Sequence, residues 1–489
     1  MRKWAPLLVL SLALAIVIID TTLLNVSLAT LVRELHTSLQ ALQWVIAAYS
    51  LTLAAFTVTG GRVGDLFGRK RMFRLGAIIF AVGSFIASIS RSMPVLLIGE
   101  SIIEGVGAAL MMPATASLLV SKYRGHDRSV AFGIWGAVAA AASAVGPILG
   151  GFLTTHYTWR WGFRINVFVA AILVTGSAII EENQPRQAKG IDFVGVLLSA
   201  LGLFLVVFGI IESPTYGWGN ALVLGSIVAG LAVLLGFVFW ERRVERGGGT
   251  PIVSMNLFRN TAFVAGASVT GLLMLSQNGV IFSLPVFLQS VLRLDAFHTG
   301  VSFLPLSVAL LIVSPAAGFL AKRVPHKRIV QTGLVISFVA LVVLHFSLHA
   351  QMSAAMLIPG LALYGMGMGM VLSQVNNLTL SAVSVRDAGE ASGVTNTFRQ
   401  VGMSLGAAII GAILLNAIVA SLGGQRSEAA NLAFGDAAGV HLSAEKAAVR
   451  SEATTRGIRD AMLVGAGFAL AGLVVSNWLP MRAHVRTED

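Results

Sequence analysis

Two acidic residues, Glu100 and Glu104, stand in the otherwise apolar run from Leu96 to Pro113. A charged side chain near the centre of a bilayer costs about 2.5 to 3.5 kcal/mol on insertion scales, so acids kept in such a run indicate a function. Their i, i+4 spacing places both carboxyl groups on one helix face. A third acid, Asp20, lies in the first apolar run. Buried carboxyl groups that lie together can bind and release protons near neutral pH, so these residues suggest proton transfer across a membrane.

The elements that carry these acids must be membrane helices. Hydrophobic residues make up 56% of the chain and charged residues only 11%, and the mean hydropathy is +0.83. Soluble domains usually carry about a quarter charged residues. The composition predicts an all-α polytopic membrane protein without room for a separate catalytic domain. The chain has no cysteine, which excludes disulfides, thiolate chemistry and cysteine-based metal sites.

About fourteen apolar runs are long enough to cross some 30 Å of hydrocarbon as helices. Basic residues cluster in the loops of one side, as at Arg69–Arg71, which predicts cytoplasmic N- and C-termini by the positive-inside rule. These loops offer no continuous basic face, so the net charge of +12 does not indicate nucleic-acid binding. The expected spans are residues 5–29, 41–63, 72–91, 94–122, 127–154, 163–182, 192–212, 220–242, 261–291, 296–321, 328–349, 354–380, 390–420 and 460–480.

The second half of the chain repeats the first. Gly61–Arg71 has a decayed copy in Gly318–Arg328, and the glycine pair of the fourth span recurs in the twelfth. Two related halves are typical of transporters with a site between them. We therefore expect two six-helix halves, residues 1–190 and 251–489, with two inserted helices over 191–250. Within the second half, residues 421–459 are expected to form an extracytoplasmic segment in which Ser443 is the N-cap of a helix running into the last span.

Several motifs resemble those of the major facilitator superfamily, specifically its branch of fourteen-helix drug:proton antiporters. The resemblance covers nearly the whole chain and implies the major facilitator fold, with a proton as the coupling ion and no other cofactor. It is carried by a first-helix signature at Asp20–Val26 and signatures of helices six and thirteen at Trp159–Val167 and Phe398–Gly402. It is also carried by a loop motif made of Gly61, Asp65, Gly68, Arg69, Lys70 and Arg71, and by an antiporter motif made of Gly146, Pro147, Gly150 and Gly151.

The basic residues of the loop motif can be explained by their effect on the orientation of the protein in the membrane. Asp65 cannot, because acidic residues contribute little to that orientation. We expect Asp65 and Arg69 to form a charge latch that holds cytoplasmic helix ends together in one state. In the antiporter motif, glycines let helix backbones approach closely, and Pro147 removes one helical hydrogen bond so that the helix can bend. Packing and bending are compatible interpretations of that motif.

Helix four departs from the family pattern. The branch usually carries Arg-x-x-Gln-Gly there, whereas this chain has Ser101 in place of the arginine and Glu104 in place of the glutamine. The protein must therefore use its glutamates or couple differently. The repeat partners of Glu100 and Glu104 are Gly360 and Tyr364, so the fold itself does not require acids at these positions. The structural alternative is that both glutamates hydrogen-bond to Thr21, Thr22 or Asn25 of the first helix.

Depth pairs Asp20 with Glu104. Asp20 lies about three residues beyond the middle of an outward-running helix, and Glu104 about three residues before the middle of an inward-running one. At 1.5 Å per residue, both carboxyl groups lie roughly 5 Å to the outer side of the midplane. Helices one and four line the central cavity in the superfamily fold, so we expect these acids to face each other or the same water. Glu100, nearer the outer interface, is a further candidate for proton coupling.

The expected substrate cavity combines polar side chains with a methionine-rich wall. Methionine is adaptable and suits varied apolar ligands, although methionine at helical spacing is more often plain packing. Arg399 is the lone basic residue that we place inside the bundle, and its structural alternative is a packing role. The candidate cavity residues are Thr21, Asn25, Gln277, Asn278, Tyr364, Met366, Gln374 and Arg399.

These features predict a proton-coupled efflux antiporter that exports amphipathic small molecules, including cations, with cationic or neutral compounds favoured over anions by an anionic cavity wall. An exporter of a lipid or secondary metabolite and an uncoupled facilitator remain alternatives. A membrane-embedded enzyme could use the glutamates as acid and base, but no nucleophile, metal cluster or phosphate-binding loop accompanies them, so we do not expect an enzyme. We expect a monomer in the bacterial cytoplasmic (inner) membrane whose partners are the lipid bilayer and a small-molecule substrate, with no nucleic acid and no metal.

Overall fold

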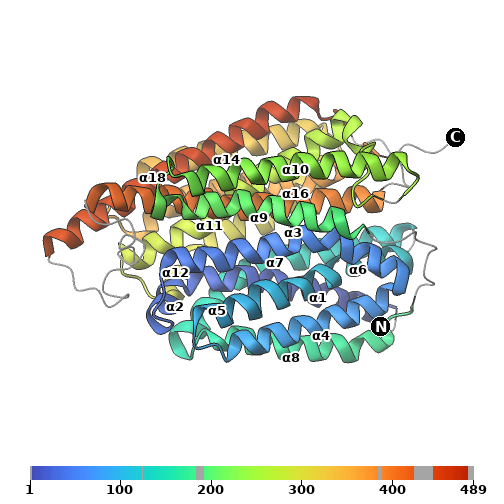
Figure 1. Ribbon diagram of the computed structural model, residues 1–489, viewed down its shortest axis with the longest axis horizontal. Coiled ribbons are helices and arrows are strands. Elements are labelled where there is room, and N and C mark those ends of the chain that lie inside the picture. Colours follow the sequence, from blue (N-terminus) through green and yellow to red (C-terminus); the bar gives the residue numbers. More distant parts are fainter. Residues whose placement is uncertain are drawn as a thin grey trace.

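The computed structural model is a bundle of roughly parallel and antiparallel helices (Figure 1). It describes residues 3–123, 125–182, 192–249, 251–383, 388–422 and 444–482, and the side chains of these residues except Asp65 and some within 120–144 or next to the gaps. Among these residues, thirteen helical stretches are long and apolar enough to cross a membrane. The 32-residue helix α7 packs among them and completes the fourteen spans that the sequence predicts.

Five of the thirteen stretches consist of two or more consecutive helical elements. The elements are α1 (Ala5–Val26), α2 (Leu28–Glu34), α3 (Leu39–Phe67), α4 (Arg69–Ser88), α5 (Met93–Leu96), η1 (Leu97–Glu104), α6 (Gly105–Lys122), α7 (Gly125–His156), α8 (Arg160–Gly176), η2 (Ser177–Ile179), α9 (Phe193–Tyr216), α10 (Ala221–Arg246), η3 (Leu257–Arg259), α11 (Thr261–Ser290), α12 (Ala296–Ser302), α13 (Leu304–Leu320), α14 (His326–Ser347), η4 (Ala354–Leu357), α15 (Ile358–Ser381), α16 (Ala388–Leu422), α18 (Ala444–Val475) and η6 (Ser476–Trp478).

Most predicted span boundaries agree with the structure to within a few residues, and the last span is the exception. Helix α18 begins at Ala444, directly after the predicted N-cap Ser443, and continues without a break into the membrane-spanning part. Residues 444–459 are helical, as the predicted start of a helix after Ser443 implies. Ser443 and the rest of 423–443 lie outside the described residues.

The first and last helices meet the same end of the bundle (Figure 1), which we call the basic end because α4 begins there at Arg69 and α6 ends there at Lys122. There the Tyr123 hydroxyl donates to the Lys3 carbonyl (2.9 Å), and the Lys327 amide donates to the Met481 carbonyl (3.3 Å). An even number of spans follows from this arrangement. We call the other end, where α2 and α12 lie, the opposite end.

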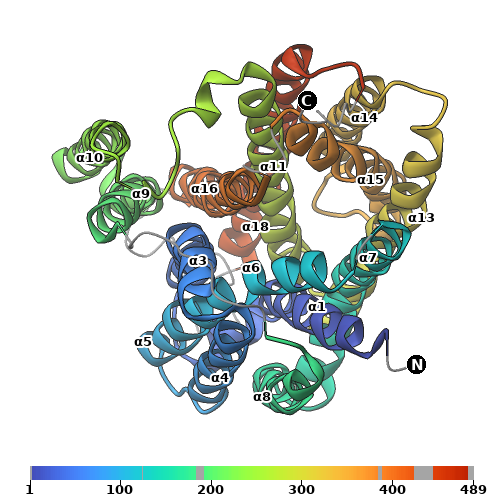
Figure 2. The same cartoon turned by 90° about the vertical axis from the view of Figure 1, so that its right-hand side faces the viewer.

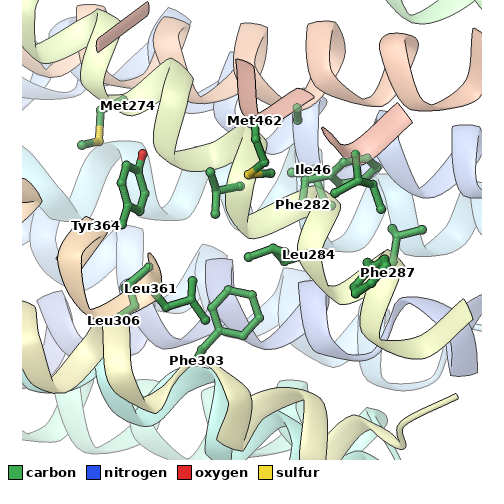
Figure 3. Packing of buried hydrophobic residues seen from close by; sticks show 14 of the residues in the cluster. Ile46, Met274, Phe282, Leu284, Phe287, Phe303, Leu306, Leu361, Tyr364 and Met462 are labelled. Atoms are coloured by element: carbon green, nitrogen blue, oxygen red, sulfur yellow. The ribbon is translucent and has the colours of Figure 1, made fainter. Parts of the chain in front are cut away.

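Two groups of helices form the bulk of the bundle, viewed along its axis in Figure 2. Helices α1, α3, α4, α6 and α8 enclose one apolar cluster, which includes Phe73 and Phe80. Helices α11, α13, α14, α15, α16 and α18 form the second group and supply most of a second cluster, which also includes residues of α2 and α3; Figure 3 shows Ile46, Phe282 and Tyr364 in it.

The inserted pair α9 and α10 lies at the edge of the bundle (Figure 2). Helix α9 packs on α3 from one group and on α16 from the other. At the opposite end, Glu212 of α9 accepts hydrogen bonds from Trp44 Nε1 (3.0 Å) and Gln40 Nε2 (3.2 Å). Helix α10 exposes a row of leucine, valine and phenylalanine side chains, as a lipid-facing helix does.

Candidate functional site

The structure brings the acids of helices one and four together inside the first group of helices. Asn166 of α8 donates through Nδ2 to Asp20 Oδ1 (2.7 Å) and to Glu104 Oε1 (3.0 Å). Asp20 is 3% exposed and Glu104 is fully buried. Because both accept from the same nitrogen atom, the two carboxyl groups are direct neighbours, and they interact electrostatically. Two carboxyl groups in contact in a dry site cannot both carry a charge, so the pair is suited to sharing a proton.

The segment that carries the glutamates is a π-helix, η1 (Leu97–Glu104), and not the α-helix that the sequence predicts. Its backbone packs tightly on α4: a Cβ atom added at Gly83 would lie 2.6 Å from the Gly99 carbonyl oxygen and 2.7 Å from Glu104 Cα. The Ser101 hydroxyl donates to the Val45 carbonyl of α3 (2.8 Å). The residue that stands where the family has an arginine thus ties η1 to α3. Turns of π-helix occur frequently at functional sites.

Glu100 belongs to the same buried cluster. It is 3% exposed and interacts electrostatically with Asp20. Three carboxyl oxygens in the cluster accept no hydrogen bond from a donor among the described residues: Asp20 Oδ2, Glu100 Oε2 and Glu104 Oε2. Buried polar atoms normally have partners, so these oxygens are places where a proton can bind.

The structural alternative for the glutamates does not hold. Thr21 and Thr22 donate to backbone carbonyls one turn earlier in α1, and Asn25 Nδ2 donates to the Thr21 carbonyl. In the described part of the chain, none of these three side chains donates to Glu100 or Glu104. The partner of Glu104 is instead Asn166.

Sequence reasoning missed two members of the cluster, Asn166 and Tyr49. Asn166 lies inside the helix-six signature, so a polar residue in an apolar helix could have marked it. Tyr49 of α3 interacts electrostatically with all three acids. For both residues, the sequence does not indicate which neighbouring helix the side chain faces.

A separate cavity lies between the two groups of helices, walled by α1 and α7 on one side and by α11 and α13 on the other. Every side chain that lines it is uncharged, and polar groups alternate with apolar ones. The lining residues are Thr22, Asn25, Val26, Ser143, Pro147, Gln277, Ile281, Pro285, Phe303, Leu306, Ser307 and Leu310.

The acids do not line this cavity. On an α-helix, Thr22 and Val26 are rotated by about 200° and 240° from Asp20. The Asp20 carboxyl group therefore points into the first group of helices, toward Asn166, while Thr22 faces the cavity. The expectation of an anionic cavity wall is wrong for this cavity, because helix α1 separates its acid from it.

The predicted cavity residues fall in several places. Asn25 and Gln277 line the cavity as predicted. Thr21 does not, and the next residue, Thr22, lines the cavity instead. Asn278 donates to the Met403 carbonyl of α16 (2.6 Å), and the Tyr364 hydroxyl lies 3.0 Å from that of Ser276. Both are thus used in packing between helices.

Three further candidates also lie away from this cavity. Met366 is exposed and is rotated by about 200° from Tyr364, which points toward α11. Gln374 is buried and donates to the Ser373 hydroxyl (3.3 Å). Arg399 is half-buried on α16.

The antiporter motif joins the two groups at the opposite end. A Cβ atom at Gly150 would lie 2.9 Å from Leu23 Cα of α1, and one at Gly146 would overlap the Thr22 hydroxyl. On the other face of α7, Gly151 packs against the Ala296 carbonyl, and Gly300 packs against the Pro147 carbonyl. Neither glycine has room for a side chain. Close backbone contact therefore closes the cavity toward the opposite end.

A second contact closes the same end. Gln289 of α11 donates to the Val26 carbonyl (2.8 Å) and accepts from the Ala29 amide (3.0 Å). Helix α1 is interrupted between these two residues, at Ser27, which frees the backbone groups that Gln289 binds.

The loop motif lies at the basic end, between α3 and α4. Gly68 has a φ of +102°, which favours glycine, and the carboxyl group of Glu182 packs against it. Glu182 Oε1 accepts from the Lys70 amide (3.0 Å) and so caps the N-terminus of α4, where a negative charge is favourable. Arg71 is exposed and Gly61 packs near Pro113. The side chain of Asp65 lies outside the described residues, so the Asp65–Arg69 latch stays a prediction.

Comparison with known proteins identifies the class. A family model described as Major Facilitator Superfamily matches residues 10–192 and 167–407. The chain belongs to this superfamily of membrane transporters.

Similar proteins include the multidrug resistance protein Stp of Mycobacterium tuberculosis (strain CDC 1551 / Oshkosh), 29% identical over 99% of this chain and 93% of that protein. The tetracenomycin C resistance and export protein of Streptomyces glaucescens is 30% identical over 85% of this chain and 77% of that protein. The fold is similar to the crystal structure of a bacterial homolog of the human lysosomal transporter Spinster in an inward-facing, unoccupied conformation. The TM-score is 0.66 at 17% identity, over 98% of this chain and 97% of that one.

Proposed function

We propose that the protein is a proton-coupled efflux antiporter that exports amphipathic small molecules across the bacterial cytoplasmic membrane. The observation that carries the proposal is the buried cluster of Asp20, Glu104 and Asn166, which can hold a proton where no solvent reaches. In this proposal the proton is the coupling ion and no other cofactor is used. The protein acts as a monomeric carrier and not as an enzyme.

The transport cycle alternates between two arrangements of the helix groups. Because the antiporter motif and Gln289 close the opposite end here, we assign that end to the outside, in agreement with the positive-inside rule. Cargo then enters the cavity from the cytoplasm. When the outer contacts open, cargo leaves and protons reach the acids, and the return to the present arrangement releases the protons inside.

The cavity supports an uncharged or delocalised amphipathic cargo. Thr22, Asn25, Gln277 and Ser307 offer hydrogen bonds, while Phe303 and the leucines offer apolar surface. A cation in this cavity would lack a carboxylate partner among the lining residues. The relatives named for multidrug resistance and for tetracenomycin C export support small-molecule efflux. A lipid or secondary metabolite is one such cargo class.

The test uses purified protein in vesicles with a panel of cationic, neutral and anionic amphipathic compounds. With a pH gradient imposed, the wild type should accumulate neutral compounds best, and Asp20→Asn and Glu104→Gln should lose accumulation while still binding the compound. Asp127→Asn, a change in an exposed ion pair with Lys3 at the basic end, is the control. Unchanged proton-dependent accumulation by folded Asp20→Asn and Glu104→Gln proteins would refute the proposal.

A further inference from the structure

Tyr49 of α3 is a buried tyrosine whose hydroxyl has no use in the present arrangement. The residue is 3% exposed, and among the described residues no atom accepts from or donates to its hydroxyl. The hydroxyl group of a buried tyrosine normally finds a hydrogen-bond partner. The Tyr49 hydroxyl is therefore available to a new partner when its surroundings change.

Tyr49 lies level with the acids of the cluster, because Val45 of α3 binds Ser101 on one side of it and Thr52 of α3 packs against Gly105 on the other. Asp20 comes from α1, and Glu104 and Glu100 come from η1; all three interact electrostatically with Tyr49. No basic side chain of the described residues interacts with this cluster. Asn166 already gives its two amide hydrogens, one to Asp20 and one to Glu104. When a proton leaves, the new carboxylate therefore needs a further donor, and two buried hydroxyl groups near the acids are unpartnered among the described residues: that of Tyr49, and that of Ser84 on α4, which interacts with Glu104.

We propose that Tyr49 is a further residue of the proton site, and that its hydroxyl donates to a carboxylate of the Asp20–Glu104–Glu100 cluster once a proton has left. This inference rests on the proposed function and adds to it the donor that stabilises the deprotonated site. Tyr49 is a positioning residue: the proton itself is carried by the acids. No bond is made or broken other than the transfer of the proton to water.

Helix α3, which carries Tyr49, also contacts α16 of the second group. A movement of α3 at Tyr49 would therefore change this contact. Gln43, six residues before Tyr49, donates to the Ala407 and Ala408 carbonyls of α16 (both 2.9 Å). Ser404 of α16 donates to the Ala47 carbonyl of α3 (3.1 Å). On the cluster side, Ser101 binds the Val45 carbonyl. Helix α3 thus connects the proton site with the contact between the two groups, away from the cargo cavity.

The test is Tyr49→Phe, which removes only the hydroxyl group. The rate of gradient-driven transport is measured in vesicles while the pH on the cytoplasmic side is varied. Because the variant lacks a donor to the carboxylate, its site keeps the proton to higher pH. We expect the midpoint of the pH profile to move upward by about one pH unit, a tenfold change in proton concentration, the size expected for one hydrogen bond.

The matched control is Tyr123→Phe. Tyr123 is a buried tyrosine at the basic end, away from the acids, and its hydroxyl donates to the Lys3 carbonyl. Its removal should leave the midpoint unmoved. A Tyr49→Phe protein that is folded and keeps the wild-type midpoint overturns the inference. Loss of all pH dependence in Asp20→Asn together with an unmoved midpoint in Tyr49→Phe would overturn the role of Tyr49 and leave the antiporter proposal standing.

A second measurement begins with the wild-type protein. Infrared difference spectra recorded while the pH is raised should show the carboxylic acid band disappear together with a shift of the tyrosine C–O band to the position of a hydrogen-bond donor. That tyrosine shift should be absent in Tyr49→Phe and present in Tyr123→Phe. A carboxylic acid band that titrates without any tyrosine change would contradict the inference, even if Tyr49→Phe does not fold.

Discussion

Asp20 and Thr22 are two residues apart on α1 and point in opposite directions. The Asp20 carboxyl group binds Asn166 inside the first group of helices, and Thr22 lines the cavity between the groups. Helix α1 is therefore a shared wall between two compartments. In the proposed antiporter, protons and cargo do not compete for one carboxylate, and coupling must pass through movement of the helices.

Replacing Asn166 tests how the acids are held. Asn166→Leu removes the donor to both carboxyl groups, and each lost hydrogen bond in a buried site costs about 1 to 3 kcal/mol. We expect a lower melting temperature and a strong loss of gradient-driven transport, with cargo affinity in the cavity nearly unchanged in equilibrium binding. Asn416→Leu is the control, because Asn416 donates only to the Ala412 carbonyl of its own helix. Equal losses in both variants would show that the effect is not specific to the acids.

Adding charge to the cavity tests its selectivity. Gln277→Glu places a carboxylate among uncharged lining residues, where a cation a few ångströms away gains on the order of 1 to 4 kcal/mol. Export of cationic compounds should rise at least tenfold relative to neutral ones, measured with the same panel in vesicles. Gln277→Met keeps the size without the charge and should retain the preference for neutral compounds. An unchanged panel in Gln277→Glu would mean that cargo does not contact this residue.

Glycine substitutions test the closure at the opposite end. Gly151→Leu cannot be fitted against the Ala296 carbonyl, so the closed arrangement is destabilised. Since the chain has no cysteine, a single Ser307→Cys substitution gives one reactive thiol in the cavity. We expect a membrane-impermeant maleimide added outside to label this thiol several times faster when Gly151→Leu is also present. Gly318→Ala, whose added Cβ atom meets nothing within 4 Å, should leave the labelling rate unchanged.

Asp295, at the N-terminus of α12 and outside the membrane-spanning part, provides a pH-dependent contact at the opposite end. Its carboxyl group accepts from the His298 amide (2.7 Å) and lies 2.8 Å from His298 Nδ1. Partial burial raises the pKa of Asp295, but the hydrogen bonds from His298 and its charge outweigh this effect and hold the pKa below its ordinary value. A lowered pKa means that the stabilisation is present above the pKa of the unfolded chain, about 3.9, and is lost as the pH falls through the lower folded value.

The expected cost of Asp295→Ala is about 1 kcal/mol at pH 7, typical of a lost helix cap and reduced by salt because the side chain is 43% exposed. The difference in melting temperature between wild type and Asp295→Ala should shrink as the pH is lowered from 5 to 3. A difference that stays constant over this range would show that the ionised carboxyl group is not the source of the stabilisation.

The sequence predicted the depth of the acidic residues in the membrane better than the direction in which the side chains point. Counting residues from the span ends paired Asp20 with Glu104, because rise per residue is nearly constant in membrane helices. Direction depends on helix rotation, where one residue corresponds to about 100°, so Thr21 was expected in the place that Thr22 occupies. The same limitation concealed Tyr49 and produced the incorrect anionic wall. The π-helix of η1 was not predictable either, because its geometry depends on packing against Gly83 of another helix.

The uncharged cavity also determines the electrical character of the proposed exchange. A neutral cargo carries no charge outward, whereas each proton carries one inward, so every cycle moves net positive charge into the cell. An inside-negative membrane voltage of 100 mV supplies about 2.3 kcal/mol for each charge moved. Export of a neutral compound should therefore continue on voltage alone when the pH is equal on both sides, and each turnover should be measurable as a current.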